Sequence, residues 1–384
     1  MELLQQAQEL QQWAVQHRRH LHQYPELSLK EHKTSDYCQE VLKSLGYTIQ
    51  TSWGCGFTAD LKKSGNSKTI AWRADMDALP MQEKNQHEFV SKNTGIAHMC
   101  GHDTHMVIAL TVAKLLIENK AQLKHNVRFL FQPSEEKAPG GALGMIEQGC
   151  LEGVDEVYGL HNDPGTEVGK IRTRVGALMA APDMFSVTIV GKGCHAARPQ
   201  DGLDPVVAGA LLVTQWQSII SRRIDPISSA VLSVTQFHAG DTDNVIADHA
   251  KLSGTVRTFN EADREQIESL MQHSLSAIEQ LGYRCEFNYL RGYDVVVNEH
   301  YGVERIKTVA SRVLTASDID IQTPPAAWAE DFCYYLQHRP GAFFFLGSGN
   351  VAEGISAPLH SSRFDIDERA LVLGAAIVAN LFVN

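Results

Sequence analysis

The pattern of apolar and polar positions over the first 183 residues predicts alternating helices and strands. Apolar residues recur at helical spacing as far as Gly46, which ends the second of two predicted helices, over about 31–45. From Tyr47 to Asp77 the spacing becomes strand-like, with a turn at Ser64-Gly-Asn66. The elements predicted next are helices over 106–117 and 142–148 and strands over 127–131 and 154–160. This alternation is typical of an α/β domain.

From about Met184 to Leu290 the predicted helices and strands follow a different order. That order is strand, helix, strand, strand, helix, strand, which is the order of a ferredoxin-like α+β unit. The ranges are strands over 185–190, 230–237, 251–257 and 284–290, and helices over 204–221 and 261–281. Because the α/β pattern resumes afterwards, the sequence predicts an α/β domain with a central sheet flanked by helices and a smaller domain inserted into it. The predicted boundaries are 1–183 and 294–384 for the larger domain and 184–293 for the insert.

Charge and composition argue against several classes of protein. The formal net charge is −11 at pH 7, and no run of Lys and Arg offers an electrostatic footprint for nucleic acid. The apolar tail from Ala370 to Val383 is shorter than the roughly 20 residues that span a bilayer, so it predicts a buried helix. The opening residues lack the features of a secretion signal, and the seven cysteines include no C-x-x-C pair. We therefore expect a cytoplasmic protein with reduced thiols and without nucleic-acid or membrane partners.

Side chains that bind metals follow apolar runs, or precede a helix, at four separate places. In an α/β sheet such groups collect beyond the carboxyl ends of the strands. The donors are Asp75 and Asp77 after 69–73, Cys100 and His102 on a glycine-containing turn, Glu135 and Glu136 after 127–131, and His161 after 157–160. Carboxylate, imidazole and thiolate groups gathered at one edge are best explained by a bound divalent metal. This set indicates a metallohydrolase.

The spacing of these donors predicts how each takes part. Alternate positions of an extended segment point the same way, so Cys100 and His102 could share one ion. The alternative for this pair is a buried cysteine and a hydrogen-bonded histidine without metal. Adjacent strand residues point to opposite sides, so one of Glu135 and Glu136 is expected to bind metal while the other acts as a general base. The alternative interpretations are a solvated strand end for the two glutamates and a capped surface position for His161.

Other residues have a weaker basis in the sequence. Asp77 is expected to hydrogen-bond a ligand imidazole and fix its tautomer. Asp75 either joins the donors or pairs structurally with Arg73. His195, at the start of the insert, could polarise a substrate carbonyl only if two domains or two subunits meet. His360, taken by itself, is an ordinary loop histidine.

Nine sequence segments, in order along nearly the whole chain, resemble a known family. They are His17-Arg-Arg-His-Leu-His-Gln-Tyr-Pro-Glu26, Arg73-Ala-Asp-Met-Asp-Ala-Leu-Pro80, His98-Met-Cys-Gly-His-Asp103, Phe131-Gln-Pro-Ser-Glu-Glu136, Gly159-Leu-His161, Gly191-Lys-Gly-Cys-His-Ala-Ala-Arg-Pro199, Asn244-Val-Ile246, Ala329-Glu-Asp-Phe332 and Leu359-His-Ser-Ser-Arg-Phe-Asp-Ile-Asp367. The chain resembles the amidohydrolase branch of the aminoacylase/carboxypeptidase G-type dinuclear metallopeptidases. That branch includes hippurate hydrolases, indole-3-acetyl-amino acid hydrolases and N-acetyl-diaminopimelate deacetylases.

The resemblance implies a role for each matching position. Two divalent ions, which could be Mn, Zn, Co or Ni, would be held by Cys100, His102, Glu136, His161 and His360. Glu135 would be the general base and Asp77 the carboxylate that orients a ligand. His195 is similar to a lid histidine that stabilises the oxyanion from the partner subunit, and Asn244 would contribute to substrate binding. The insert would then be a lid and dimerisation domain on a catalytic domain.

The expected activity is hydrolysis of the amide bond of N-acyl amino acids, such as hippurate or N-acetyl amino acids. The small-molecule substrate would be attacked by metal-activated water. A dipeptidase or aminopeptidase of the same clan is the first alternative, and a metal-dependent binding protein without turnover is the second. The open sheet edges of the insert predict a homodimer or a higher oligomer, because such edges are commonly covered by pairing.

Overall fold

The computed structural model describes residues 2–63, 65 and 67–384, and the chain divides into two compact units. Unit 1 comprises Met1–Leu178, Val296–Pro324 and Asp331–Asn384, and unit 2 comprises Met179–Val295 and Pro325–Glu330. The segment predicted as an insert, 184–293, lies within unit 2, which also takes residues 179–183, 294–295 and 325–330 from the ranges assigned to the larger domain. Ser64 and Asn66 of the predicted turn lie outside the described residues.

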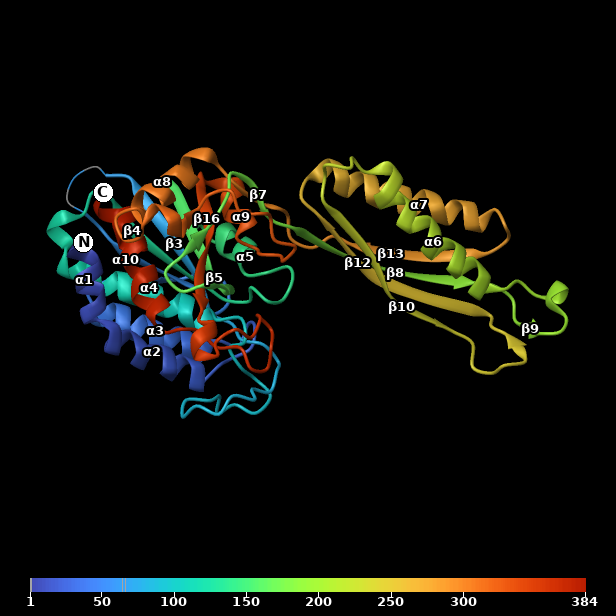
Figure 1. Cartoon of the computed structure of the whole chain (residues 1–384), viewed down its shortest axis with the longest axis horizontal. Coiled ribbons are helices and arrows are strands. Elements are labelled where there is room, and N and C mark those ends of the chain that lie inside the picture. The colour runs from blue at the N-terminus through green and yellow to red at the C-terminus, as the bar shows by residue number, and fades with distance from the viewer. Residues whose placement is uncertain (1, 64, 66) are drawn as a thin grey trace. The chain divides into compact units, whose positions relative to one another are not determined.

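In the described part of unit 1, eight strands form one mixed sheet in the order β1-β2-β4-β3-β5-β16-β6-β15 (Figure 1). Their bounds are Thr48–Thr51 (β1), Phe57–Leu61 (β2), Thr69–Asp75 (β3), Asn126–Gln132 (β4), Glu156–Glu167 (β5), Ile171–Arg172 (β6), Ile319–Asp320 (β15) and Gly341–Gly349 (β16). β3 pairs in parallel with β4 and β5, and β16 pairs in parallel with β5. Strands β7 (Gly176–Met179) and β14 (Val296–Asn298) form a separate ladder.

Helices of unit 1 cover this sheet and form most of its core. They are α1 (Glu2–Glu9), α2 (Gln11–Gln23), α3 (His32–Ser44), α4 (His102–Glu118), α5 (Ala142–Glu147), α8 (His300–Ala310), α9 (Cys333–His338) and α10 (Arg369–Val383). α4 and α10 are buried along nearly their whole length and pack on each other, which explains why α10 and the part of α4 after His105 are apolar on nearly all sides. A Cβ at Gly374 would lie 2.8 Å from Leu346 and 2.9 Å from Ile108, so glycine permits this close packing. None of the helices within residues 2–63, 65 and 67–384 has the length and apolar character needed to cross a membrane.

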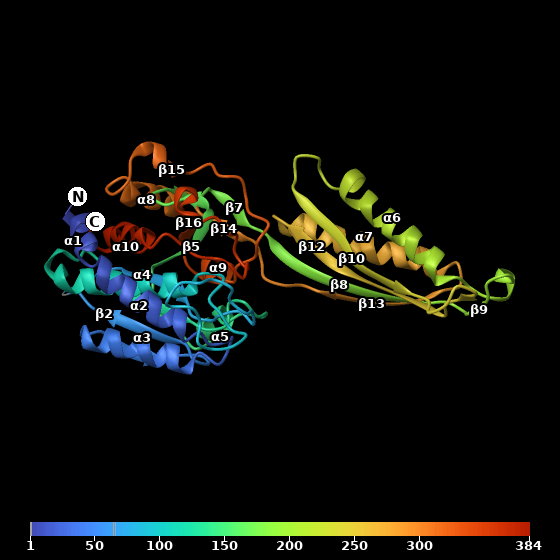
Figure 2. The ribbon, with the colours of Figure 1, turned by 60° about the horizontal axis from the view of Figure 1, so that its bottom comes forward.

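Unit 2 has the ferredoxin-like order that the sequence predicts, and the α/β prediction for unit 1 is confirmed with it. The elements are β8 (Ala181–Val190), α6 (Pro205–Arg223), β10 (Ala230–Ala239), β12 (His249–Thr258), α7 (Glu261–Glu279) and β13 (Arg284–Leu290). The strands form an antiparallel sheet in the order β10-β12-β8-β13, and both helices lie on one face of it (Figure 2). Trp216 of α6 is fully buried there and meets Phe185 of β8 edge to face at 5.1 Å.

Replacing Asn260 by alanine is expected to lower the free energy of unfolding of unit 2 by about 1 kcal/mol. Asn260 is the N-cap of α7, where its side-chain oxygen accepts a hydrogen bond from the Asp263 amide at 2.8 Å. Asn260→Ser, which keeps an accepting oxygen, is the matched control. Urea unfolding monitored by hydrogen exchange of unit 2 measures both variants, and an equal loss in the two would contradict the capping role.

Candidate metal centre

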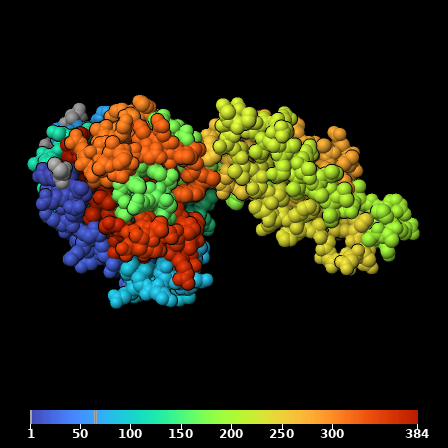
Figure 3. All heavy atoms as spheres, in the orientation of Figure 1, coloured from blue at the N-terminus to red at the C-terminus, as the bar shows by residue number. Residues whose placement is uncertain are grey.

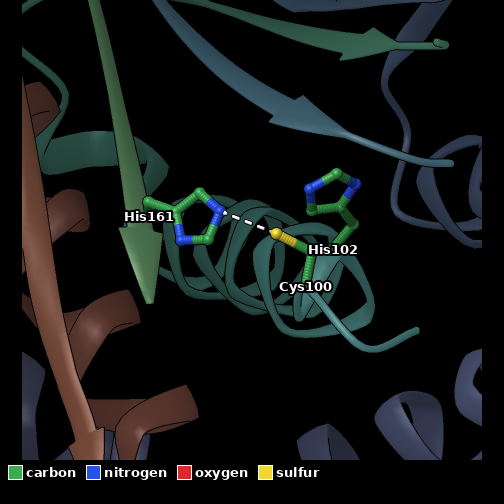
Figure 4. Close-up of side chains that lie close together, drawn as sticks. All are labelled: Cys100, His102 and His161. Atoms are coloured by element: carbon green, nitrogen blue, oxygen red, sulfur yellow. Dashed lines mark hydrogen bonds between the residues drawn. The ribbon is translucent and has the colours of Figure 1, made fainter. Parts of the chain in front are cut away.

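The N-terminus of α4 carries two of the predicted donors. Gly101 precedes the helix with φ of 87°, and a Cβ there would lie 2.2 Å from Oδ1 of Asn162, so only glycine fits. The helix begins at His102 itself, whereas the sequence predicted an extended segment followed by a helix from residue 106. That prediction was wrong about the local structure: a left-handed turn, rather than strand alternation, brings Cys100 and His102 together (Figure 4).

His161 lies inside β5 rather than at its end. The predicted strand stops at residue 160, immediately before this histidine. The strand continues to Glu167 because β16 pairs in parallel with it through these positions. The His161 ring points toward Cys100, and its Nε2 lies 3.3 Å from the sulfur (Figure 4).

The two adjacent glutamates lie on a loop. β4 ends at Gln132, so the prediction that Glu135 and Glu136 belong to a strand end and face opposite sides is wrong. Carboxylate oxygens of both lie within 4.8 Å of each other and of a ring nitrogen of His102. Ser134, just before them, has φ of 58°, a left-handed conformation that few residues other than glycine adopt.

Three consecutive backbone amides fix this loop. The amide of Ser134 donates to the carboxylate of Glu31 at 2.8 Å. The amides of Glu135 and Glu136 donate to the two oxygens of Asp77 at 2.9 and 3.0 Å. Glu31 and Asp77 are both buried, so two carboxylates from distant parts of the chain fix the backbone of this loop from the protein interior.

All five predicted metal ligands converge with Glu135 at this place in unit 1. Three overlapping groups each have one donor atom per residue within 4.8 Å of one another. The groups are Cys100, His102 and His161; Cys100, Glu136 and His360; and His102, Glu135 and Glu136. His360 Nε2 lies 3.2 Å from Glu136 Oε1, so the loop histidine is brought to the cluster by the fold.

Both buried histidines present the same nitrogen to the cluster. His102 Nδ1 lies 2.8 Å from the main-chain carbonyl oxygen of Asp77, and His161 Nδ1 lies 2.7 Å from that of Asn162. A carbonyl oxygen accepts from a protonated Nδ1, so Nε2 is the nitrogen that each ring turns toward the other donors. The orienting contact predicted for the Asp77 side chain is therefore made by its carbonyl, while the carboxylate lies 3.4 Å from His102 Nδ1.

The electrostatics of the cluster fit divalent cations. Burial raises the pKa of the Cys100 thiol well above its usual value, and Glu136 raises it further. Burial opposes protonation of His102, yet Asp75 and other carboxylates raise the pKa of this ring to about 10. His102 Nε2 and Glu136 Oε1 are buried and make no hydrogen bond to the described residues. Such a set requires positive charge, and a bound metal would also convert the thiol to a thiolate.

A network of buried polar contacts lies behind the metal-binding side chains. The sequence left the role of Asp75 in it undecided and did not predict the contact that Asp75 makes with His105. Asp75 pairs with Arg73 at 2.5 Å, as one of its two interpretations held. The other oxygen of Asp75 lies 2.6 Å from Nδ1 of His105, whose Nε2 accepts from the amide of Asn162 at 3.0 Å. This chain of contacts ends beside His161 and so orients that part of β5.

The remaining predicted residues belong to unit 2. His195 is on β9 (Cys194–His195), which pairs with β11 (Val245–Ile246). Asn244 lies next to them, since its carbonyl accepts from the amide of Ala196 at 3.0 Å. Both side chains are exposed within this unit.

Comparison with known proteins gives consistent matches. The model of the family described as Peptidase family M20/M25/M40 matches residues 71–384. Thermostable carboxypeptidase 1 of Saccharolobus solfataricus is 38% identical over 381 residues, 98% of this chain and 96% of the relative. The N-acyl-L-amino acid amidohydrolase of Geobacillus stearothermophilus is 43% identical over 290 residues, 75% of this chain and 78% of the relative. A solved Bacillus subtilis structure, described as a dinuclear metal-binding peptidase from the M20 family, matches with a TM-score of 0.85 at 32% identity and covers 98% of each chain.

Proposed function

Since this chain belongs to peptidase family M20/M25/M40, and is a hydrolase of that family, we propose that it cleaves the amide bond of N-acyl amino acids. The products would be a carboxylic acid and a free amino acid. The observation that carries this proposal is the position of Glu135, a carboxylate suited to proton transfer, against a cluster of five metal-binding side chains. The relative named as an N-acyl-L-amino acid amidohydrolase supports the substrate class.

Cys100, His102, Glu136, His161 and His360 are the proposed ligands of two divalent ions. Such ions would supply Lewis acidity to the substrate carbonyl and make water more acidic. The solved relative described as dinuclear supports the number of ions. One thiolate, one carboxylate and three imidazoles suit Mn, Zn, Co or Ni alike.

Glu135 is the proposed general base. Its carboxylate would accept the proton of the attacking water and deliver it to the leaving amine. The backbone contacts of its loop keep the carboxylate beside His102. We further propose that His195 stabilises the oxyanion and that Asn244 binds substrate, with unit 2 serving as the lid and dimerisation domain.

A peptidase acting on unblocked dipeptides is the second candidate, and the relative named as a carboxypeptidase favours it. Release of free amino acid from N-acyl amino acids and from unblocked dipeptides, by protein reloaded with Mn²⁺ or Zn²⁺, separates the two. We expect cleavage of the blocked substrates. Cleavage of dipeptides alone would assign the chain to the peptidases, and no cleavage of either class by metal-loaded protein would contradict both assignments.

Replacing Glu31 by alanine is expected to lower kcat/KM by roughly 10–100-fold. The Ser134 amide would lose its acceptor, so one of the three contacts that position the loop of Glu135 would be lost, while the two to Asp77 remain. Glu31→Gln keeps an accepting oxygen and should retain most of the activity. Metal content measured on both variants should stay close to that of the wild type, which separates a misplaced base from a lost ion. An unchanged rate in Glu31→Ala would contradict the positioning role.

A further inference from the structure

We propose that unit 1 binds a further divalent cation, with zinc as the best fit, through His22, Glu83 and His87. None of these three residues belongs to the candidate metal centre described above. One ligand atom from each lies within 4.8 Å of the other two. His22 comes from α2, whereas Glu83 and His87 come from the segment between β3 and α4.

The distances around Glu83 suit a first-row metal. His22 Nε2 lies 3.2 Å and His87 Nε2 lies 3.3 Å from the same carboxylate oxygen, Oε1. Ligands about 2.0–2.2 Å from a tetrahedral zinc are separated by roughly this distance. Two histidines and one glutamate are also a ligand set that zinc uses with a fourth position open to water.

Each proposed ligand is already oriented by a second contact. His22 Nδ1 lies 2.9 Å from the carboxylate of Asp103, which is the carboxylate–histidine arrangement that supports metal-binding imidazoles. The other oxygen of Glu83 accepts from the amide of Ser91 at 2.7 Å. The His87 ring is stacked on Phe89 with the centroids 3.7 Å apart. Neither nitrogen of His87 makes a hydrogen bond to any residue that the structure describes, although Nε2 lies 3.3 Å from Glu83 Oε1.

The surrounding charges leave a deficit that a dication would balance. Arg18 contacts Asp103, Asp365 and Glu368, and Arg19 contacts Glu368 as well. With Glu83, four carboxylates therefore face two guanidinium groups. Burial opposes protonation of His22, but Asp103 and Glu83 raise its pKa to about 9, so without an ion this imidazole offsets one of the two excess charges. One divalent ion with both imidazoles neutral would bring the whole group to neutrality.

The site is reachable, and its position indicates a structural role. His87 and Phe89 line a surface pocket of about 640 Å³, through which an ion and a water ligand could enter. The same segment is tied to the C-terminal region, since the Lys84 amide donates to the Ser362 carbonyl at 2.7 Å. Figure 3 shows this segment, in cyan, on the surface of unit 1 beside the C-terminal segment in red. An ion would fasten α2 to a stretch that has no helix or strand of its own.

The test compares zinc content in the wild type and in His87→Leu. Protein stripped with a chelator, reloaded with excess Zn²⁺ and gel-filtered is expected to hold one ion more per chain than the variant. Leucine keeps the apolar contact with Phe89, so the variant should fold and retain its hydrolytic activity. His338→Leu, an exposed histidine at the end of α9, is the matched control and should bind as the wild type does.

Cobalt distinguishes this site from the candidate metal centre. The Co²⁺ spectrum lost in His87→Leu should lack a sulfur-to-cobalt charge-transfer band, because the site has no cysteine. Zinc should also raise the melting temperature of the wild type more than that of the variant. Equal ion counts in the two proteins would overturn the proposal and leave His22 as a hydrogen-bond partner of Glu83 and His87 as a ring stacked on Phe89. The test compares the number of ions bound by the wild type and by His87→Leu, so its result does not depend on which substrate the enzyme cleaves.

Discussion

Replacing Glu135 by glutamine is expected to reduce kcat for N-acyl amino acids by roughly 10²–10⁴-fold while the metal content stays unchanged. The amide has nearly the shape of the carboxylate but cannot accept the proton of water. The backbone amide of Glu135 would still donate to Asp77, so the loop should keep its conformation. Steady-state kinetics together with metal analysis of the purified protein measure the two quantities separately.

Two comparisons sharpen this experiment. Glu136→Gln, one position along the same loop, should instead lose metal, since Glu136 lies 3.2 Å from His360 and within 4.8 Å of Cys100. Mixing Glu135→Gln with His195→Ala subunits should restore activity if His195 acts on the site of the partner subunit. Near-normal turnover by Glu135→Gln would show that another group accepts the proton.

Replacing Asp183 by alanine is expected to destabilise unit 2 by about 3–5 kcal/mol. Asp183 and Arg264 form a buried ion pair, in which Nε and Nη2 of the arginine lie 3.0 and 2.6 Å from the carboxylate. Tyr289 and the amide of Gly292 also donate to Asp183. Removing the carboxylate would leave a buried guanidinium without its main partner, together with two unsatisfied donors. Hydrogen exchange of unit 2 peptides in increasing urea measures the loss where it occurs.

A second aspartate that pairs with Arg264 shows how much of the expected loss of stability comes from burial of the ion pair. Asp294 also pairs with Arg264, at 2.6 Å, but 41% of its side chain is exposed. Asp294→Ala should therefore cost no more than about 1 kcal/mol, because solvent screens an exposed pair. Similar losses in the two variants would show that burial of Asp183 adds nothing to the pair.

The sequence predicted the two domains well because their patterns differ in period and order. Residues 185–190 alternate in the way a half-buried strand must, and β8 has that alternation, with Phe185, Val187 and Ile189 buried. The parallel strands of unit 1 are buried on both faces and are therefore continuous apolar runs. A continuous apolar run shows reliably that a strand is present, but it does not show at which residue the strand ends. The predicted strand 154–160 ends before His161, whereas β5 continues to Glu167.

The metal-binding residues of the candidate site could be predicted from the sequence. The buried residues that hold them in position could not. The donors lie in short segments that match a family in order, so each could be named from the sequence. Glu31 and His105 have no such local signature: each is a single polar residue whose partner lies far away in the chain. Glu31 meets Ser134 across 103 positions of the chain, and His105 meets Asp75 across 30. Long-range contacts of this kind leave no periodicity in the sequence.

The place of β16 in the sheet has a consequence for how this chain is made on the ribosome. β16 lies between β5 and β6, although residues 341–349 are synthesised long after both of these strands. The segment 181–290 contains all four strands of the unit 2 sheet and can therefore fold as it emerges. Meanwhile the nascent first segment carries β5 with an unpaired, apolar edge, which is a template for association with other chains. Expression of this protein should therefore depend on chaperones that bind the nascent chain, and truncations that end before residue 341 should aggregate.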